Sequence, residues 1–300
     1  MTVLASIPLI VLGGSVTTLR AGMAEPGWLQ PEGHLLWLYP WEKRIASAGV
    51  FVEHHHREFG MLVGILCIKT FFAVLLTKRG KCAIWTAFVG LAAVSGQGIL
   101  GGTRVLDNSP QFAFLHGFIG LAVFGVLVGV AVLLSKPWAE LPAPRWAKAP
   151  RIGMLSILTL VGLMTQVFFG AWYRHGHGHT AIAIHGLWAI GVVWLGVVLA
   201  KRLKRAAQQE GVDPGLIKIL RRSAFWMTLF LHLQWVLGGL TLYALFLMSD
   251  GMSGENISGG EIVFATMHVT VGAMLIGSVV NVFLWSRRLD TPSALVESSS

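Results

Sequence analysis

The stretch Val52-Glu53-His54-His55-His56-Arg57-Glu58-Phe59-Gly60 places ionisable and metal-binding side chains where the sequence turns into a long apolar segment. Polar residues at membrane depth are costly and are usually retained for function. Glu53 and His56 are three residues apart, so they share one face of a helix. A histidine that faces the interior of a helical bundle can ligate a metal or a haem iron. We therefore expect a metal site at His56 with Glu53 beside it.

The composition is that of an integral membrane protein. Of the 300 residues, 54% are hydrophobic and only 12% are charged, against about 25% charged in soluble domains. Seven apolar segments reach the roughly 20 residues that cross a bilayer, and an eighth, Val3 to Leu19, is shorter. No basic region precedes this short segment, which we interpret as the first helix rather than a signal peptide. We predict an all-α fold of eight transmembrane helices, the seven longer ones near residues 50–77, 82–103, 111–134, 152–173, 181–200, 224–248 and 261–285.

The distribution of positive charge predicts the topology. A net charge of +9 is compatible with nucleic-acid binding, yet the basic residues fall in connections between apolar segments. The connections near residues 78–81, 136–151, 201–222 and 287–288 carry 16 of the 23 lysines and arginines. By the positive-inside rule, these connections and both termini are cytoplasmic. We expect a bacterial plasma membrane, since no organelle presequence is recognisable, and no nucleic-acid partner.

An internal repeat organises the chain into four helical hairpins. Each hairpin has a pair of small residues late in its first helix, and a histidine followed four residues later by a small residue early in its second. In the last three hairpins a glutamine precedes the small pair by four residues, at positions 97, 166 and 234. The four sets are Gly13-Gly14 with His56 and Gly60, Gly101-Gly102 with His116 and Gly120, Gly170-Ala171 with His185 and Ala189, and Gly238-Gly239 with His268 and Gly272.

A planar ligand explains this repeat better than helix packing does. Small residues let membrane helices approach closely, but packing alone does not require a histidine in every hairpin. An imidazole that coordinates iron, with small residues leaving room for the macrocycle, accounts for both features. Because each bundle of four helices offers two histidines, it could supply both axial ligands of one haem. We predict ligation by His56 and His116 in a four-helix bundle of residues 1–140, and by His185 and His268 in a second, pseudo-symmetric bundle of residues 141–300.

Arginines lie at equivalent places outside the small pairs. Arg20, Arg104 and Arg174 have this position, and Arg57 adjoins His56. Arginine binds carboxylates through a bidentate fork, so these residues either pair with haem propionates or lie at the headgroup level.

The remaining histidines are weaker candidates. We interpret His54 and His55 as interfacial and His232 as a packing residue. The glycine-separated tract His175, His177 and His179 is an alternative metal site with little preorganisation.

Together these residues resemble the haem A synthase family over nearly the whole chain. The elements that carry the resemblance are Gly13-Gly14-x-Val16-Thr17, Pro26-x-Trp28, Glu53-x-x-His56-Arg57-x-x-Gly60, Gln97-x-x-x-Gly101-Gly102-x-Arg104-Val105, Leu115-His116-Gly117 and His268-x-x-x-Gly272. One departure concerns the first outer loop: many bacterial members carry a cysteine pair there, and residues 20–50 contain none.

The resemblance implies an enzyme that oxidises the C8 methyl of haem O to a formyl group, giving haem A for terminal oxidases. It implies a catalytic N-terminal half that holds the substrate through Glu53, His56 and His116, and a C-terminal half that holds haem b through His185 and His268. Haem O synthase and an electron-transfer partner are the expected partners, and a homo-oligomer is left open. Glu53 also distinguishes the halves within this sequence, because no carboxylate precedes the other three histidines by three residues.

Two other functions fit parts of the pattern. A di-haem b-type electron carrier linked to quinol would need the same four histidines but not Glu53. A transporter would match the paired halves, but Gly- or Pro-broken helices near the midplane are missing from the sequence.

Overall fold

The computed structural model describes residues 1–141, 149–175, 178–208, 214–248 and 257–290. Over these ranges the chain is helical and has no strand. Short 3-10 turns at Pro31–Gly33 and Leu36–Leu38 lie in the first long connection, and a π-helical turn at Ala244–Met248 extends α9. The helices are α1 (Thr2–Thr18), α2 (Trp41–Arg44), α3 (Ala48–Leu76), α4 (Lys81–Leu106), α5 (Pro110–Leu133), α6 (Lys136–Glu140), α7 (Ala149–Arg174), α8 (Gly178–Ala206), α9 (Pro214–Tyr243) and α10 (Gly259–Asp290).

Seven of these helices, α3, α4, α5 and α7 to α10, are long and apolar enough to cross a membrane. The prediction of an all-helical, multi-pass membrane protein is therefore confirmed. Helix α1 has 17 residues, so its role as an eighth span stays a prediction. The largest difference in bounds is at α9, which begins at Pro214 rather than near residue 224. Its first turns carry Lys218, Arg221 and Arg222, whose long side chains can extend along the helix while their charges remain in the polar layer.

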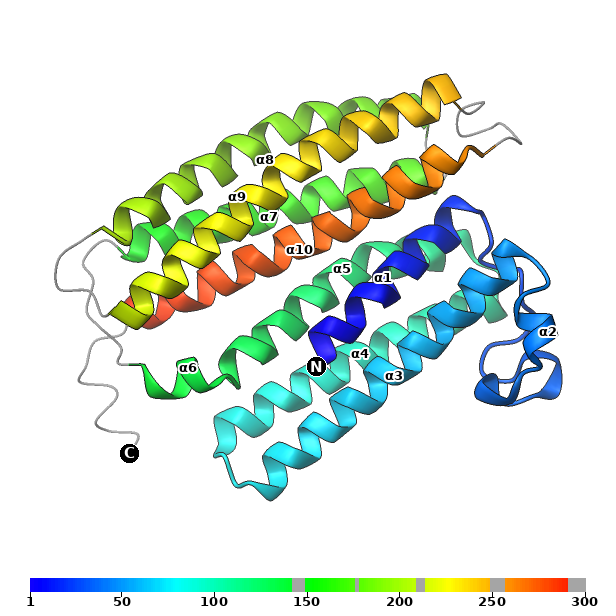
Figure 1. Cartoon of the computed structure of the whole chain (residues 1–300), viewed down its shortest axis with the longest axis horizontal. Coiled ribbons are helices and arrows are strands. Elements are labelled where there is room, and N and C mark those ends of the chain that lie inside the picture. The colour runs from blue at the N-terminus through cyan, green and yellow to red at the C-terminus, as the bar shows by residue number, and fades with distance from the viewer. Residues whose placement is uncertain (142–148, 176–177, 209–213, 249–256, 291–300) are drawn as a thin grey trace.

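The long helices contact one another in two closed series. Helix α1 contacts α3 and α5, and α4 contacts the same two helices; α7, α8, α9 and α10 form a second series in which α10 returns to α7 (Figure 1). Helix α10 joins the two series because it also contacts α1 and α5. Glycines allow this close approach: a methyl group added at Gly125 would lie 3.2 Å from Ile276, and one at Gly277 would lie 2.9 Å from Val128.

The connection between α1 and α3, residues 19–47, projects from one end of the molecule (Figure 1). We call it the first loop. It ends at Ser47, whose hydroxyl accepts a hydrogen bond from the Val50 N–H and caps α3. By contrast, α3 and α4 are joined by a tight turn in which Gly80 has a φ of 87°, a conformation that glycine adopts without strain. The first loop therefore lies at the same end of the molecule as the first residues of α3.

Candidate functional site

The first glycine of each hairpin lies against the histidine of the facing helix. A methyl group added at Gly13 would lie 2.7 Å from His56 Cε1, and one at Gly101 would lie 2.7 Å from His116 Cε1. Carbon atoms normally approach to about 3.5–4.0 Å, so the imidazoles occupy the space that a side chain would need. The third and fourth hairpins repeat the contact at 3.0 Å and 3.3 Å, between Gly170 and His185 and between Gly238 and His268.

The second residue of the small pair contacts other segments. Gly14 faces Thr266 of α10, with an added methyl group 3.3 Å from its Cγ2. Gly102 faces the indole of Trp28 in the first loop, which an added methyl group would approach to 2.3 Å. The glycine pair in α1 thus holds both a histidine and the neighbouring helix, while the pair in α4 holds a histidine and the loop.

The four histidines meet in two pairs. The ring centres of His56 and His116 are 6.2 Å apart with planes at 89°, and those of His185 and His268 are 6.2 Å apart with planes at 68°. His56 is on α3 and His116 on α5, which stand opposite each other in the contact series of the N-terminal half. His185 on α8 and His268 on α10 are opposite in the same way. The structure therefore brings together the residues that the repeat singled out.

The protonation of two of these rings is set by their hydrogen bonds. His56 Nδ1 donates to the carbonyl oxygen of Leu9 at 3.0 Å, and His185 Nδ1 donates to the carbonyl oxygen of Gln166 at 3.0 Å. A main-chain carbonyl only accepts, so the proton resides on Nδ1. The lone pair of Nε2 is then available to a metal.

The spacing within each pair fits two imidazoles bound to one metal ion. A metal–imidazole bond is about 2.0 Å, and a ring centre lies about 1.1 Å behind its nitrogen, which places two opposed ring centres about 6.2 Å apart. No group of three or more His, Cys, Asp or Glu side chains that could hold a metal ion occurs in the described part of the chain. Two-histidine sites of this kind suit a cofactor that supplies the other ligands itself.

Two of the small residues four positions after the histidines lie against glutamines. A methyl group added at Gly120 would lie 2.9 Å from Nε2 of Gln97, and one at Gly272 would lie 2.8 Å from Nε2 of Gln234. These two glycines provide space for glutamine side chains from the facing helix. That the small residues also leave room for a macrocycle stays a prediction.

Both carboxylate oxygens of Glu53 are engaged at the junction of α3 and the first loop. Oε1 accepts from Arg57 Nη2 at 2.7 Å, and Oε2 accepts from the main-chain N–H of Glu25 at 2.9 Å. The residue is 2% exposed. Arg57 also donates to the carbonyl oxygens of Glu25, Gly27 and Trp28. Glu53 and Arg57 therefore hold the first loop against the helix that carries His56.

Glu25 and His54 complete this junction. His54 Nδ1 lies 2.8 Å from Glu25 Oε1, the two residues are 0% and 1% exposed, and the ring of Tyr39 stacks on His54 with centres 5.4 Å apart. The interpretation of His54 as interfacial is wrong, because the first loop folds over it. Glu25 was not predicted at all, since a single acidic residue in a loop has no periodicity or spacing to distinguish it.

The four predicted arginines lie in different surroundings. Arg57 has the contacts described above. Arg104 lies against Gly22, where an added methyl group would overlap its guanidinium, and it is within electrostatic range of Glu53, His56 and His116. Arg174 donates to Gly14 O at 3.2 Å and to Thr18 Oγ1 at 2.5 Å, and so links α7 to α1. Arg20 is exposed and has a φ of 53°.

The other histidine candidates are only partly covered. His177 and the side chain of His179 lie outside the described residues, so the predicted tract is not tested. His175 is placed near the first pair, with Nε2 3.6 Å from the position of a methyl group added at Gly117. His232 Nδ1 donates to the Thr228 carbonyl oxygen at 2.7 Å within its own helix.

The fold and the site define a helical membrane protein with paired, buried histidines. Comparison with models of protein families identifies the family. A model described as cytochrome oxidase assembly protein matches residues 1–184, and the chain belongs to this family. Its relatives include heme A synthases of Cereibacter sphaeroides, so the resemblance to the haem A synthase family is confirmed. No solved structure gave a significant match.

The relatives are distant and the matches are partial. The heme A synthase of strain ATCC 17025 is 25% identical over an alignment of 196 residues, and the match covers 54% of this chain and 50% of the relative. That of strain KD131 is 23% identical over 195 residues, with the same coverage. The chain thus spans about half the length of the curated relatives it matches. The family match ends at residue 184, immediately before His185, so the second histidine pair rests on the internal repeat and on the structure.

Proposed function

We propose that this protein is a haem A synthase, which oxidises the C8 methyl of haem O to a formyl group. The observation that carries the proposal is the pair His56 and His116, at 6.2 Å between ring centres, with the buried carboxylate of Glu53 one helical turn from His56. The relatives named heme A synthase support haem A synthesis as the setting. The formyl chemistry and the identity of the substrate are part of the proposal.

In this proposal the two halves have different tasks. His56 and His116 hold the substrate haem O in residues 1–140. His185 and His268 hold haem b in residues 141–300. When bound, that haem would relay electrons. The contact series of α1, α3, α4 and α5 and of α7 to α10 support an arrangement of eight spans in two pseudo-symmetric four-helix bundles.

Glu53 is held in one position in the first half. Its two oxygens accept hydrogen bonds from Arg57 and from the Glu25 N–H, so neither oxygen is without a partner. Of the two roles considered for it, proton acceptor and stabiliser of developing positive charge, these contacts favour the second. Preorganised charge in a site without water is typically the largest electrostatic contribution to a rate.

Arginines near the outer ends of the histidine helices are the proposed partners of the haem propionates. Arg104 is the best placed in the first half, since it is within electrostatic range of both histidines. Arg174 is within electrostatic range of His268 and has the same position in the second half. Arg57 already donates to three carbonyl oxygens in the first loop and to Glu53, so it serves better to orient Glu53. Arg20 remains a candidate from the sequence alone.

The basic connections support a plasma-membrane protein with both termini in the cytoplasm and the first loop outside. Haem O reaches the site from the bilayer, with haem O synthase and an electron donor or acceptor as partners.

Extraction of the pigment from purified protein tests the proposal. Chromatography should separate haem b together with haem O or haem A. Glu53→Gln should keep the haem content but reduce haem A by about 10²- to 10⁴-fold, the usual range for an acid–base or electrostatic catalytic group. The exposed Glu42, changed to Gln, is the matched control. Undiminished haem A in Glu53→Gln would exclude the role of this residue, and haem b as the sole pigment would favour the di-haem electron carrier.

A further inference from the structure

The first hairpin differs from the other three at one position beside its histidine. Four residues before the small pair, the later hairpins carry a glutamine and the first carries Leu9. Gln97 Nε2 donates to the His116 carbonyl oxygen at 2.7 Å, and Gln166 Nε2 donates to the His185 carbonyl oxygen at 2.9 Å. These bonds join two facing helices at the histidine itself. Leucine has no donor, so the main chain of His56 is without this bond.

The helix that carries Leu9 also contains a proline at the preceding position. Pro8 lies inside α1, where it removes one main-chain donor and its ring opposes the preceding turn. The hydroxyls of Ser15, Thr17 and Thr18 donate to carbonyl oxygens four residues earlier in the same helix, a pattern that bends helices. The carbonyl oxygen that accepts the hydrogen bond of His56 therefore belongs to the residue directly after Pro8.

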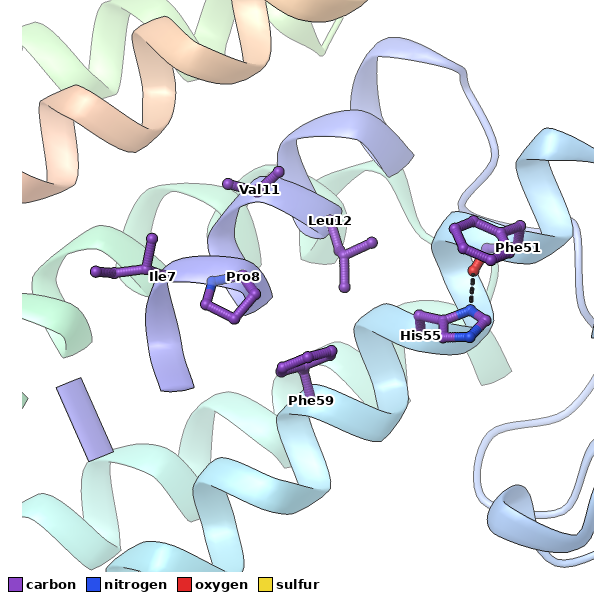
Figure 2. Close-up of a pocket in the computed structure, with 7 residues that line it drawn as sticks. All are labelled: Ile7, Pro8, Val11, Leu12, Phe51, His55 and Phe59. Atoms are coloured by element: carbon purple, nitrogen blue, oxygen red, sulfur yellow. Dashed lines mark hydrogen bonds between the residues drawn. The ribbon is translucent and has the colours of Figure 1, made fainter. Parts of the chain in front are cut away.

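Packing between α1 and α3 is incomplete at the same level. An open groove of about 450 Å³ lies between the two helices. Figure 2 shows Pro8 and Leu12 of α1 on one side of it and His55 and Phe59 of α3 on the other. Within the hairpin, a methyl group added at Gly60 would lie 3.9 Å from Leu9 Cδ1, whereas the equivalent contacts with Gln97 and Gln234 are 2.9 Å and 2.8 Å.

We infer that His56 is the releasable member of the first histidine pair, and that Gln97 is the positioning residue that keeps His116 in place, because its Nε2 contacts both the ring Nδ1 and the carbonyl oxygen of His116. The inference rests on the proposed function, because it concerns ligands of a bound haem. Movement of His56 with α1 and α3 would open one coordination position in the N-terminal half, on the side of the groove. In the second pair, Gln166 holds the carbonyl oxygen of His185 in the same way.

Carbon monoxide binding to the reduced, haem-loaded protein tests this inference without measuring turnover. Carbon monoxide binds only where an axial ligand leaves, so the wild type should bind it at the haem of the first half. Leu9→Gln should lower the carbon monoxide affinity of that haem about fivefold, the effect of one added hydrogen bond on an opening equilibrium. Gly60 leaves room for the longer amide. Gln166→Leu should raise the carbon monoxide affinity of the second haem by a similar factor.

Leu4→Gln is the matched control, since Leu4 is on the same helix and 67% exposed, and its carbon monoxide binding should equal that of the wild type. Equal binding in Leu9→Gln and wild type would overturn the inference, as would a coloured wild type that binds no carbon monoxide. Gln166→Leu keeps the test decisive if Leu9→Gln does not fold: an unchanged carbon monoxide affinity of the second haem in that variant contradicts the role of the glutamines. Colourless wild-type protein would instead refute the proposed haem site.

Discussion

Substitution of Gly101 by alanine should weaken haem binding in the N-terminal half. The added methyl group would lie 2.7 Å from Cε1 and 3.1 Å from Nδ1 of His116, so the imidazole has to move away from α4. Overpacking of this kind costs about 1–3 kcal/mol. If the displaced ring loses that much as a ligand, haem affinity falls by about 5- to 150-fold.

The assay is the rate at which purified protein transfers haem to an excess of a competing haem-binding protein, followed by absorbance. Gly98→Ala is the matched control on the same helix, because no atom lies within 4 Å of the added methyl group. Alanine is also the better helix former by about 1 kcal/mol, so this control should retain its haem. Gly238→Ala, with a nearest contact of 3.3 Å to His268, should have an intermediate effect on the second haem.

The prediction is tested most directly by the order of the three variants in their rates of haem loss. Equal haem loss from Gly101→Ala and Gly98→Ala would refute the contact between Gly101 and His116. Faster loss from Gly238→Ala than from Gly101→Ala would show that the distance of the added methyl group does not control ligand placement.

Two further predictions concern the first loop. Glu25→Ala removes the buried carboxylate whose oxygens lie 2.8 Å from His54 Nδ1 and 3.4 Å from Arg57 Nη1. It should lower the free energy of unfolding by about 3–5 kcal/mol, whereas the exposed Glu42→Ala should change it by less than about 0.5 kcal/mol in the same thermal unfolding assay. Burial, with Glu32 nearby, raises the pKa of the Tyr39 phenol. Its folded form therefore holds its proton more tightly than the unfolded chain, and the associated stability is complete below about pH 10 and lost as the pH rises through the folded pKa. Tyr39→Phe should remove that alkaline loss, and an unchanged profile of melting temperature against pH would contradict it.

The repeat in the sequence located the histidine pairs because it is periodic. The four histidines occur at the same position of the repeat. Once the hairpins are recognised, this position predicts that each histidine faces a glycine of the other helix in its hairpin. Their partners across each half, His56 with His116 and His185 with His268, followed from the same register.

The sequence was less informative about the residues around the pairs. A small residue four positions after each histidine shows that space is needed there but not what occupies it, and at Gly120 and Gly272 the structure places Gln97 and Gln234 in that space. Glu25 lies 28 positions from Glu53, and a long loop without periodicity can bring any of its residues to that place. The burial of His54 depends on the same loop and could not be predicted from its helix alone.

Helix α10 has a consequence for how the protein is assembled. Over half of its most apolar window is buried, at 56%, against 11–33% for the other six long helices, and it contacts α1, α5, α7 and α9. All of these helices precede it in the sequence, so they enter the membrane before their common partner is made. During synthesis, the surfaces of these helices that pack against α10 therefore stay uncovered until α10 is inserted.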